Sequence, residues 1–368
     1  YGRQAQKNSW DFDEGGISKN RDRTPSANTI GLGYDADAIR PRHLHSRMER
    51  VRRPNMEIAK LASIAKALVA PGKGILAADE SSGTIKRRFD SINTESTSDN
   101  RRDYREMLFR TGGVDSYISG VILYDETIRQ DAADGTPMVK VLSDRGIIPG
   151  IKVDKGTQPL AGFPNELVTE GLDGLGPRLD EYRGLGARFA KWRALFNVGK
   201  GIPSPNCIGV NAHALARYAA LCQQADMVPI VEPEVFMEGD HSIESCYAAT
   251  KATLREVFLQ LEQQGVALEG MLLKPNMVVS ASSAANRANA KAVAEMTIDC
   301  FKRTIPAAMP GIVFLSGGQD DDEATANLNA INIEAAKVGA PWTISYSFGR
   351  GLQAAPLKAW MGHAENIP

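Results

Sequence analysis

Short apolar runs rich in β-forming residues recur along the chain with helix-like segments between them, and this alternation limits the possible folds more than any other feature. Such an alternation is typical of a parallel sheet whose strands are joined by crossover helices. Helical spacing occurs at residues 100–109, 212–224, 243–264 and 285–303. The eight apolar runs lie at residues 74–79, 118–124, 147–154, 188–196, 227–236, 271–278, 311–317 and 343–350.

Eight strands between residues 56 and 368 predict a single closed (β/α)8 TIM barrel. An open doubly wound sheet is the alternative, because a count of strands does not exclude it. Residues 1–55 have no apolar periodicity and are rich in Gly, Asn, Ser and Asp, so we expect a flexible N-terminal arm before the barrel domain. Six Arg between Arg40 and Arg53 leave organellar targeting by this arm open, although its acidic residues are unusual in transit peptides.

The charge balance and the cysteine usage exclude several classes of protein. A net charge of -1 provides no field that attracts polyanions, so we expect no general binding to nucleic acid or to membrane surfaces. No apolar run approaches 18 residues, so a membrane span has no support. The four cysteines form no CxxC pair, which favours a reducing compartment and hence the cytoplasm. The five His form no ligand-like cluster, and we expect neither a metal nor a cofactor.

Charged residues interrupt the late part of several apolar runs, where a strand covered on both faces should hold Val, Ile and Leu. Three pairs are spaced two apart, so each pair shares one face of its strand, which we expect to be the inner face of a closed barrel. For a single pair, a solvated strand end is the simpler explanation, but the coincidence over several strands predicts an active site at the carboxyl end of the barrel. The set is Asp79, Lys152, Asp154, Lys191, Arg193, Glu232, Glu234 and Lys274.

Lys274 is the most informative member of this set. It follows three apolar residues and precedes Pro275, so we expect its amine to leave an apolar wall among other cations. Burial and neighbouring positive charge disfavour an ammonium ion, and a neutral lysine amine attacks carbonyl carbon to form a Schiff base. The alternative is a lysine that extends from a strand end and pairs with Glu232 or Glu234.

Two Gly-rich turns follow the last two predicted strands and are typical of phosphate binding. Their glycines let backbone N–H groups approach an anion, Ser316 adds a hydroxyl, and Arg350 offers a bidentate clamp. Loops after the seventh and eighth strands are also the usual phosphate site of this barrel. A second group after the first strand predicts another phosphate site, so the expected substrate has a phosphate at each end and a carbonyl between them. That second group is Ser81, Ser82, Thr84, Arg87, Arg88 and Lys152.

These motifs resemble those of class I, Schiff-base-forming fructose-1,6-bisphosphate aldolases over residues 58–358. The resemblance is carried by GKGILAADESSGTIKRRF, GIKVDKG, RFAKWRA, VPIVEPEV, LEGMLLKPNMV, FLSGGQ and SFGRGLQA. It implies reversible cleavage of fructose 1,6-bisphosphate to dihydroxyacetone phosphate and glyceraldehyde 3-phosphate, in glycolysis and gluconeogenesis. It also implies a metal-independent reaction.

The resemblance further implies roles for individual residues. Lys274 would form the iminium with the ketose C2, Glu232 would act as acid and base in the dehydration, and Asp79 would receive the C4 hydroxyl proton. Lys191 and Glu234 would tune charge around the iminium. The implied ligands of the 1-phosphate are Ser316, Gly317, Gly318, Gly349 and Arg350. Those on the 6-phosphate side are Ser81, Thr84, Arg87, Arg88, Arg101, Lys152 and Arg193.

The resemblance leaves alternatives open and has one departure. The family ends in a tail with a terminal Tyr that assists proton exchange, and no such tail precedes Pro368. If the chain is a fragment, we expect ordinary turnover from the native protein; if it is complete, we expect slower turnover. A phosphosugar-binding scaffold with impaired turnover and a Schiff-base lyase for another bisphosphorylated ketose, such as sedoheptulose bisphosphate, are the alternative functions. The resemblance also suggests a homotetramer and a cytoskeletal partner.

Overall fold

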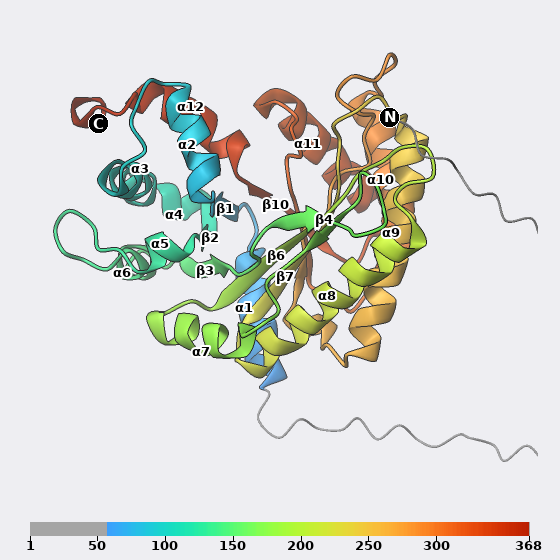
Figure 1. Cartoon of the computed structure of the whole chain (residues 1–368), viewed down its shortest axis with the longest axis horizontal. Coiled ribbons are helices and arrows are strands. Elements are labelled where there is room, and N and C mark those ends of the chain that lie inside the picture. The colour runs from blue at the N-terminus through green and yellow to red at the C-terminus, as the bar shows by residue number, and fades with distance from the viewer. Residues whose placement is uncertain (1–56, 368) are drawn as a thin grey trace, which may run out of the picture. The chain divides into compact units, whose positions relative to one another are not determined.

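A computed structural model describes residues 57–367, and this part of the chain forms a closed barrel of eight parallel strands, as the sequence predicted (Figure 1). Around the barrel the order is β1-β2-β3-β6-β7-β8-β9-β10, after which β10 pairs with β1. The strands are β1 (Gly74–Ala78), β2 (Ile118–Leu123), β3 (Ile148–Lys152), β6 (Phe189–Phe196), β7 (Val228–Val235), β8 (Leu272–Leu273), β9 (Gly311–Phe314) and β10 (Thr343–Phe348).

Helices surround this barrel and connect its strands (Figure 1). Those before β6 are α1 (Ile58–Leu68), α2 (Ser82–Asp90), α3 (Ser98–Arg110), α4 (Val114–Tyr117), α5 (Asp125–Ile128), α6 (Met138–Ser143) and α7 (Leu175–Leu185). Those after it are α8 (Pro205–Gln224), α9 (Ile243–Gln263), α10 (Ala290–Lys302), α11 (Asp321–Lys337) and α12 (Arg350–Trp360), with 3-10 turns at Leu268–Gly270 and Ala364–Asn366.

The four helical segments predicted from spacing are confirmed at α3, α8, α9 and α10, but residues 285–289 of the fourth precede α10 and are not helical. The largest boundary difference is at α8, which begins at Pro205 and not at residue 212. Ser204 explains the earlier start, because its side chain accepts a hydrogen bond from the Cys207 N–H, and Pro205 suits the first helical turn. The predicted arm at residues 1–55 lies outside the described residues, so the division into arm and domain stays a prediction.

All eight strands are shorter than their apolar runs, and at two of them, β8 and β9, the reason is visible. The sixth run was predicted as residues 271–278, but β8 is only Leu272–Leu273 because Pro275 has no N–H to continue the ladder. The seventh run ends at Phe314, since Gly317 and Gly318 adopt positive φ angles of 60° and 94° and turn the chain. A small antiparallel hairpin was also not predicted; it consists of β4 (Thr157–Pro159) and β5 (Leu167–Thr169).

One face of α1 packs against one end of the barrel interior. Leu61, Ala65 and Leu68 are fully buried and belong to a cluster with Phe189 on β6 and Val228 on β7. Phe189 and Val228 are the first residues of their strands, so α1 closes the amino end of the barrel. The carboxyl ends of the strands therefore remain as the open end.

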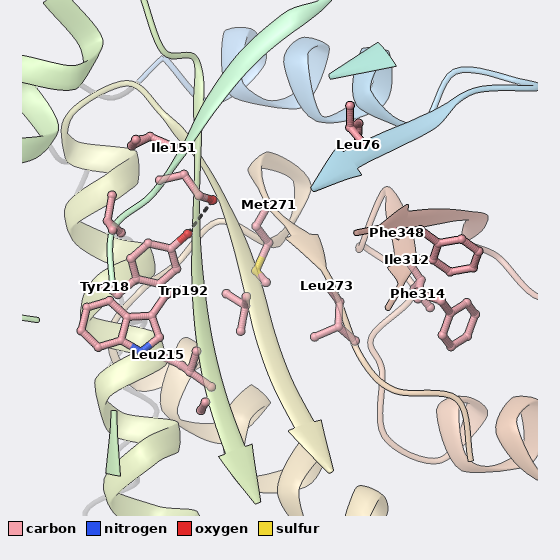
Figure 2. Packing of buried hydrophobic residues seen from close by; sticks show 14 of the residues in the cluster. Leu76, Ile151, Trp192, Leu215, Tyr218, Met271, Leu273, Ile312, Phe314 and Phe348 are labelled. Atoms are coloured by element: carbon pink, nitrogen blue, oxygen red, sulfur yellow. Dashed lines mark hydrogen bonds between the residues drawn. The ribbon is translucent and has the colours of Figure 1, made fainter. Parts of the chain in front are cut away.

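The outer face of β6 is anchored by aromatic side chains (Figure 2). Trp192 is fully buried, and its ring centroid lies 5.6 Å from that of Tyr218 on α8. The Tyr218 hydroxyl donates a hydrogen bond of 2.6 Å to the Ala190 carbonyl. Because side chains alternate along a strand, fixing Trp192 outward turns Lys191 and Arg193 inward.

Gly150 on β3 is a position where the barrel interior has no room for a side chain. A Cβ atom there would lie 2.3 Å from the ring of Phe189. We expect Gly150→Ala to lower the free energy of unfolding by about 1–3 kcal/mol, because the ring or the strand must move. Urea denaturation measures this change. Gly176→Ala in α7 is the control, since a Cβ there meets nothing within 4 Å; equal effects of the two substitutions would contradict the prediction.

Candidate active site

A cavity of about 870 Å³ opens at the carboxyl ends of the barrel strands. All eight charged residues that interrupt the apolar runs line it, and they come from five different strands or strand ends. The structure therefore brings together the complete set of charged residues that the sequence predicted at the carboxyl end of the barrel. They are Asp79, Lys152, Asp154, Lys191, Arg193, Glu232, Glu234 and Lys274.

Strand register explains how two lysines are tolerated next to each other. Lys152 on β3 and Lys191 on β6 are directly paired across the two strands. Asp154 lies between them: its Oδ1 is 2.6 Å from the Lys152 Nζ and its Oδ2 is 3.9 Å from the Lys191 Nζ. The carboxylate separates two ammonium groups that would otherwise repel each other in a buried place.

Lys191 is the cation at the centre of the cluster. Its Nζ lies 2.7 Å from Asp79 Oδ2 and 3.4 Å from Glu232 Oε2, and the residue is only 4% exposed. Burial alone would lower the pKa of Lys191, but the charges of Asp79, Glu232 and Asp154 outweigh it and raise the pKa above its usual value. Lys191 is therefore a permanent positive charge at neutral pH.

Asp79 follows the end of β1 and lies against this charge. Burial would raise the pKa of Asp79, but Lys191, Lys274 and Lys152 together lower it from 3.8 to about 2. Asp79 is thus an ionised carboxylate at neutral pH. A buried carboxylate in this state can accept a proton from a hydroxyl group that a ligand brings beside it.

Glu232 bridges the two lysines of the cluster. Its Oε1 lies 3.2 Å from the Lys274 Nζ, and both residues are at most 4% exposed. Its Oε2 is buried and accepts no hydrogen bond from the described residues, although the Lys191 ammonium is 3.4 Å away. One oxygen of this carboxylate therefore faces the amine while the other still has lone pairs for a proton.

The surroundings of Lys274 differ in one respect from the sequence expectation, which placed it among cations. The charged group in contact with it is the Glu232 carboxylate, because the register of β7 and β8 brings Val231 beside Leu273 and so places the next two residues together. The contact with Glu232 agrees with the alternative of an ion-paired lysine. The burial does not, because a lysine that extends from a strand end keeps its ammonium in water.

Glu234 is engaged by Arg193 on the neighbouring strand. The Arg193 Nε donates to Glu234 Oε2, and Glu234 is 5% exposed. Burial would lower the pKa of Arg193, but Glu234 raises it above its usual value. This pair forms the side of the cavity next to the bridging carboxylate, because Arg193 is in register with Glu232.

The two Gly-rich turns predicted to bind phosphate lie next to each other. A Cβ atom added to Gly318 would lie 3.6 Å from the Arg350 Nη2, so the turn after β9 contacts the first residue of α12. Ser316, Gly317 and Gly349 line the cavity, whereas Gly318 and the exposed Arg350 are not among its lining residues in the described part of the chain. The N-terminus of α12 contributes the positive end of a helix dipole at this place.

The second group predicted to bind phosphate is only partly assembled around the cavity. Ser81, Thr84 and Lys152 line it, and the hydroxyls of Ser81 and Thr84 lie 3.2 Å apart at the start of α2. Arg88 also lines it, but its Nη2 lies 3.9 Å from the place of a Cβ on Gly349, beside the turn after β10.

Two arginines of that predicted group are directed elsewhere. The Arg101 guanidinium forms an ion pair with Glu126 and donates to the Ser96 carbonyl, which explains why Arg101 is absent from the described cavity lining. Arg87 is likewise absent from that lining; its Nη2 donates to Thr84 Oγ1 over 3.3 Å. Any role of Arg87 and Arg101 in binding phosphate stays a prediction.

Some lining residues were not among the predicted site residues. Ser347 on β10 is 1% exposed, and its hydroxyl has no hydrogen-bond partner among the described residues. Its signal was the alternation in TISYSF, which places Ser345 and Ser347 on one face. Tyr124 and Tyr182 also line the cavity, but from loop and helix positions that have no periodic signal.

Two kinds of structural feature are absent from residues 57–367. That part of the chain contains no group of three or more His, Cys, Asp or Glu side chains placed to hold a metal ion. It also contains no helix long and apolar enough to cross a membrane.

The buried position of Asp79 makes the stability of the protein depend on pH. Because the pKa of Asp79 is lowered to about 2, its contribution to the free energy of unfolding is complete above pH 4 and is lost as the pH falls through about 2. We expect the stability difference between wild type and Asp79→Asn to shrink by about 1 kcal/mol between pH 6 and pH 3. Urea denaturation at both pH values measures it. Asp90→Asn, at an exposed pair with Lys86, is the control and should show no such change.

Comparison with known proteins identifies the class of protein that this barrel and cavity belong to. The family model "Glycolytic: Fructose-bisphosphate aldolase class-I" matches residues 60–368. A probable class 1 fructose-bisphosphate aldolase of Xanthomonas campestris is 58% identical over 306 residues, covering 83% of this chain and 90% of that protein. The cytosolic fructose-bisphosphate aldolase 5 of Arabidopsis thaliana is 52% identical over 308 residues, covering 84% of this chain and 85% of that protein.

A solved structure agrees with these matches. The fructose-bisphosphate aldolase of Plasmodium falciparum, in complex with TRAP and a small-molecule inhibitor, superposes with a TM-score of 0.82 at 48% identity, covering 84% of this chain and 89% of that one. The chain therefore belongs to the class I fructose-bisphosphate aldolases, lyases that carry out the aldol cleavage of fructose 1,6-bisphosphate in glycolysis.

Proposed function

We propose that Lys274 is the amine that forms the Schiff base and that Glu232 is the acid and base for its formation. In this scheme Glu232 Oε1 takes a proton from the Lys274 ammonium, 3.2 Å away, and the neutral amine attacks the C2 carbonyl of fructose 1,6-bisphosphate. A proton moves from the nitrogen to the former carbonyl oxygen as the carbinolamine forms. Glu232 then returns its proton to this hydroxyl, which leaves as water. The product is a protonated imine between the Lys274 nitrogen and C2.

Asp79 is the proposed base for the cleavage step. It removes the proton from the C4 hydroxyl, the C3–C4 bond breaks, and its electron pair moves into the protonated imine to form an enamine. The C4 fragment leaves as glyceraldehyde 3-phosphate. Protonation of the enamine at C3 and hydrolysis of the imine then release dihydroxyacetone phosphate and regenerate Lys274. The low pKa of Asp79, about 2, keeps it ionised and ready to accept the proton.

Lys191 and the Arg193–Glu234 ion pair provide fixed charges around the reacting groups during these steps. Lys191 lies within 3.4 Å of carboxylate oxygens of both Asp79 and Glu232, and its charge keeps Asp79 in the ionised form. Once Lys274 carries the substrate as an iminium, Glu232 and Asp79 balance its positive charge. The cluster thus supplies opposite charges at fixed positions in a buried place, where they act more strongly than in water.

Two groups of cavity-lining residues suit the two phosphates of the substrate. Ser316, Gly317 and Gly349, beside the N-terminus of α12, are the proposed ligands of the 1-phosphate, with Gly318 and Arg350 at its edge. Ser81, Thr84 and Lys152 are the proposed ligands of the 6-phosphate, with Arg193 next to them. Arg88 also lines the cavity, and its guanidinium lies near Gly349.

The contact of Lys274 with Glu232 inside the cavity carries this proposal, and reduction of the Schiff base tests it. Borohydride added with dihydroxyacetone phosphate should fix the triose to one lysine, and peptide mapping should identify Lys274. The control uses borohydride without the phosphosugar. Labelling of another lysine, or none in a folded and active sample, would overturn the assignment.

Several finer properties complete the proposal. We assign the protein to the cytoplasm, as the relatives named cytosolic support, and leave targeting by residues 1–55 open. A homotetramer is proposed from the family resemblance, and light scattering of the purified protein tests it. A cytoskeletal partner is proposed on the same resemblance.

Relative turnover of fructose and sedoheptulose bisphosphates tests the alternative that the enzyme acts on another ketose. Efficient turnover of either substrate excludes the alternative of a scaffold with impaired turnover.

A further inference from the structure

The chain leaves its ladder with β7 at Lys274, the first residue after β8. The ladder between β7 and β8 ends at Val231 and Leu273, followed by one backbone hydrogen bond of 2.8 Å from the Lys274 N–H to the Val231 carbonyl. On its other side β7 stays paired with β6 as far as Val235. Beyond Val231, the part of β7 that carries Glu232 and Glu234 is therefore not paired with a strand on the side where Lys274 lies.

A buried side-chain amide occupies the place of the missing ladder. Asn276 is 4% exposed, and its Oδ1 accepts a hydrogen bond of 3.0 Å from the Val235 N–H at the end of β7. Its Nδ2 donates to Thr250 Oγ1 on α9 over 3.1 Å and to the Met277 carbonyl over 3.0 Å. Asn276 thus joins the chain after Lys274 to both β7 and α9.

The Asn276–Val235 hydrogen bond lies close to the proposed catalytic pair along both chain segments. Lys274 is two residues before Asn276, and Val235 is three residues after Glu232 and directly follows Glu234. The backbone bond at Val231 and the side-chain bond at Val235 are the two attachments that fix the Lys274 segment to β7 on this side. On the opposite side the Pro275 carbonyl accepts a hydrogen bond of 3.2 Å from the Leu315 N–H after β9. Loss of the Asn276 bond therefore loosens the segment on its β7 side, where Lys274 meets Glu232.

We propose that Asn276 is a positioning residue that holds the Lys274 amine against the Glu232 carboxylate. This inference rests on the proposed Schiff-base function of Lys274. Asn276 is not among the residues that line the cavity in the described part of the chain, so we expect it to act on imine formation and to leave phosphate binding unchanged. An error of about 1 Å in such a pair can reduce a rate by about a hundredfold.

Asn211 provides a matched control. It is a fully buried asparagine on α8 whose Oδ1 accepts from the Thr169 N–H over 3.1 Å and whose Nδ2 donates to the Leu167 carbonyl over 2.8 Å. It joins a helix to the β4–β5 hairpin and has no bond to the Lys274 segment. Asn211→Leu therefore loses the same kind of buried hydrogen bonds as Asn276→Leu, away from the catalytic pair.

The experiment compares Asn276→Leu, Asn211→Leu and Thr250→Val with wild type. Three quantities are measured: the rate of borohydride labelling with saturating dihydroxyacetone phosphate, the dissociation constant of a hexitol 1,6-bisphosphate, which has no carbonyl group, and the free energy of unfolding. We expect Asn276→Leu to label about tenfold to a hundredfold more slowly with bisphosphate affinity within about twofold of wild type. Asn211→Leu should lose stability but label within about twofold of wild type.

The Thr250→Val variant keeps the test decisive if Asn276→Leu does not fold. It removes one acceptor of the Asn276 Nδ2 and keeps the Met277 carbonyl as another, and we expect labelling to slow by about threefold. Equal labelling rates for the Asn276 and Asn211 variants, or a wild-type rate for Thr250→Val, would overturn the positioning role. So would a loss of bisphosphate affinity in proportion to the labelling rate. Failure of the wild type to label at Lys274 is a different result, which overturns the proposed function and this inference with it.

Discussion

Lys274→Met is expected to abolish both borohydride labelling and aldol cleavage, with a loss of kcat of about four orders of magnitude or more. The thioether has no nitrogen with which to form an imine, so the C3–C4 bond has no acceptor for its electron pair. A chain of similar length fills the place that the buried Lys274 leaves. The loss should therefore be in kcat, with bisphosphate affinity little changed.

The structure of the variant should survive this substitution. Glu232 loses its contact with the Lys274 Nζ but keeps the Lys191 ammonium 3.4 Å away, so its buried charge is still balanced. Circular dichroism and urea denaturation establish that the variant is folded. Lys140→Met, at an exposed ion pair with Asp144, is the control and should retain full activity. Residual cleavage above about one part in a thousand of the wild-type rate would show that another group carries the reaction.

The position of these residues could be predicted from the sequence because two regularities coincide there. Apolar runs identified the strands, and charges spaced two apart within them, such as Lys191 and Arg193, had to share a face. A barrel gathers the carboxyl ends of all its strands at one end, so these local patterns predicted a common site. The Trp192–Tyr218 contact on the outer face of β6 shows why the alternation holds there.

The pairings inside the site were not accessible in the same way. The partner of Arg101 is Glu126, 25 residues away in α5, and nothing in either local pattern indicates that they meet. The neighbour of Lys274 depends on the register between β7 and β8, which a strand's own sequence does not state. In the sequence Asn276 looks like an ordinary polar residue after a proline. Its role becomes visible only because β8 ends early, so that the Val235 N–H has no strand partner and donates to Asn276 instead.

Removal of Lys191 has the other large expected effect, because it leaves buried carboxylates without their shared cation. Its ammonium lies 2.7 Å from Asp79, 3.4 Å from Glu232 and 3.9 Å from Asp154. Asp154 keeps Lys152 and Glu232 keeps Lys274, so Asp79 loses the most. We expect Lys191→Met to lose about 3–5 kcal/mol of stability at pH 7, the usual effect of breaking a buried ion pair from one side.

The pH dependence separates this charge effect from a simple loss of packing. Without Lys191, burial raises the pKa of Asp79 in the folded variant, so the folded state takes up a proton before the unfolded state does. The stability difference from wild type should therefore shrink as the pH falls from 7 toward 4, and Asp79→Asn added to Lys191→Met should recover part of the loss at pH 7. Urea denaturation of the single and double variants at pH 7 and pH 5 measures both effects. A difference that does not change with pH, together with no recovery in the double variant, would mean that Lys191 stabilises the barrel through its aliphatic chain and not through its charge.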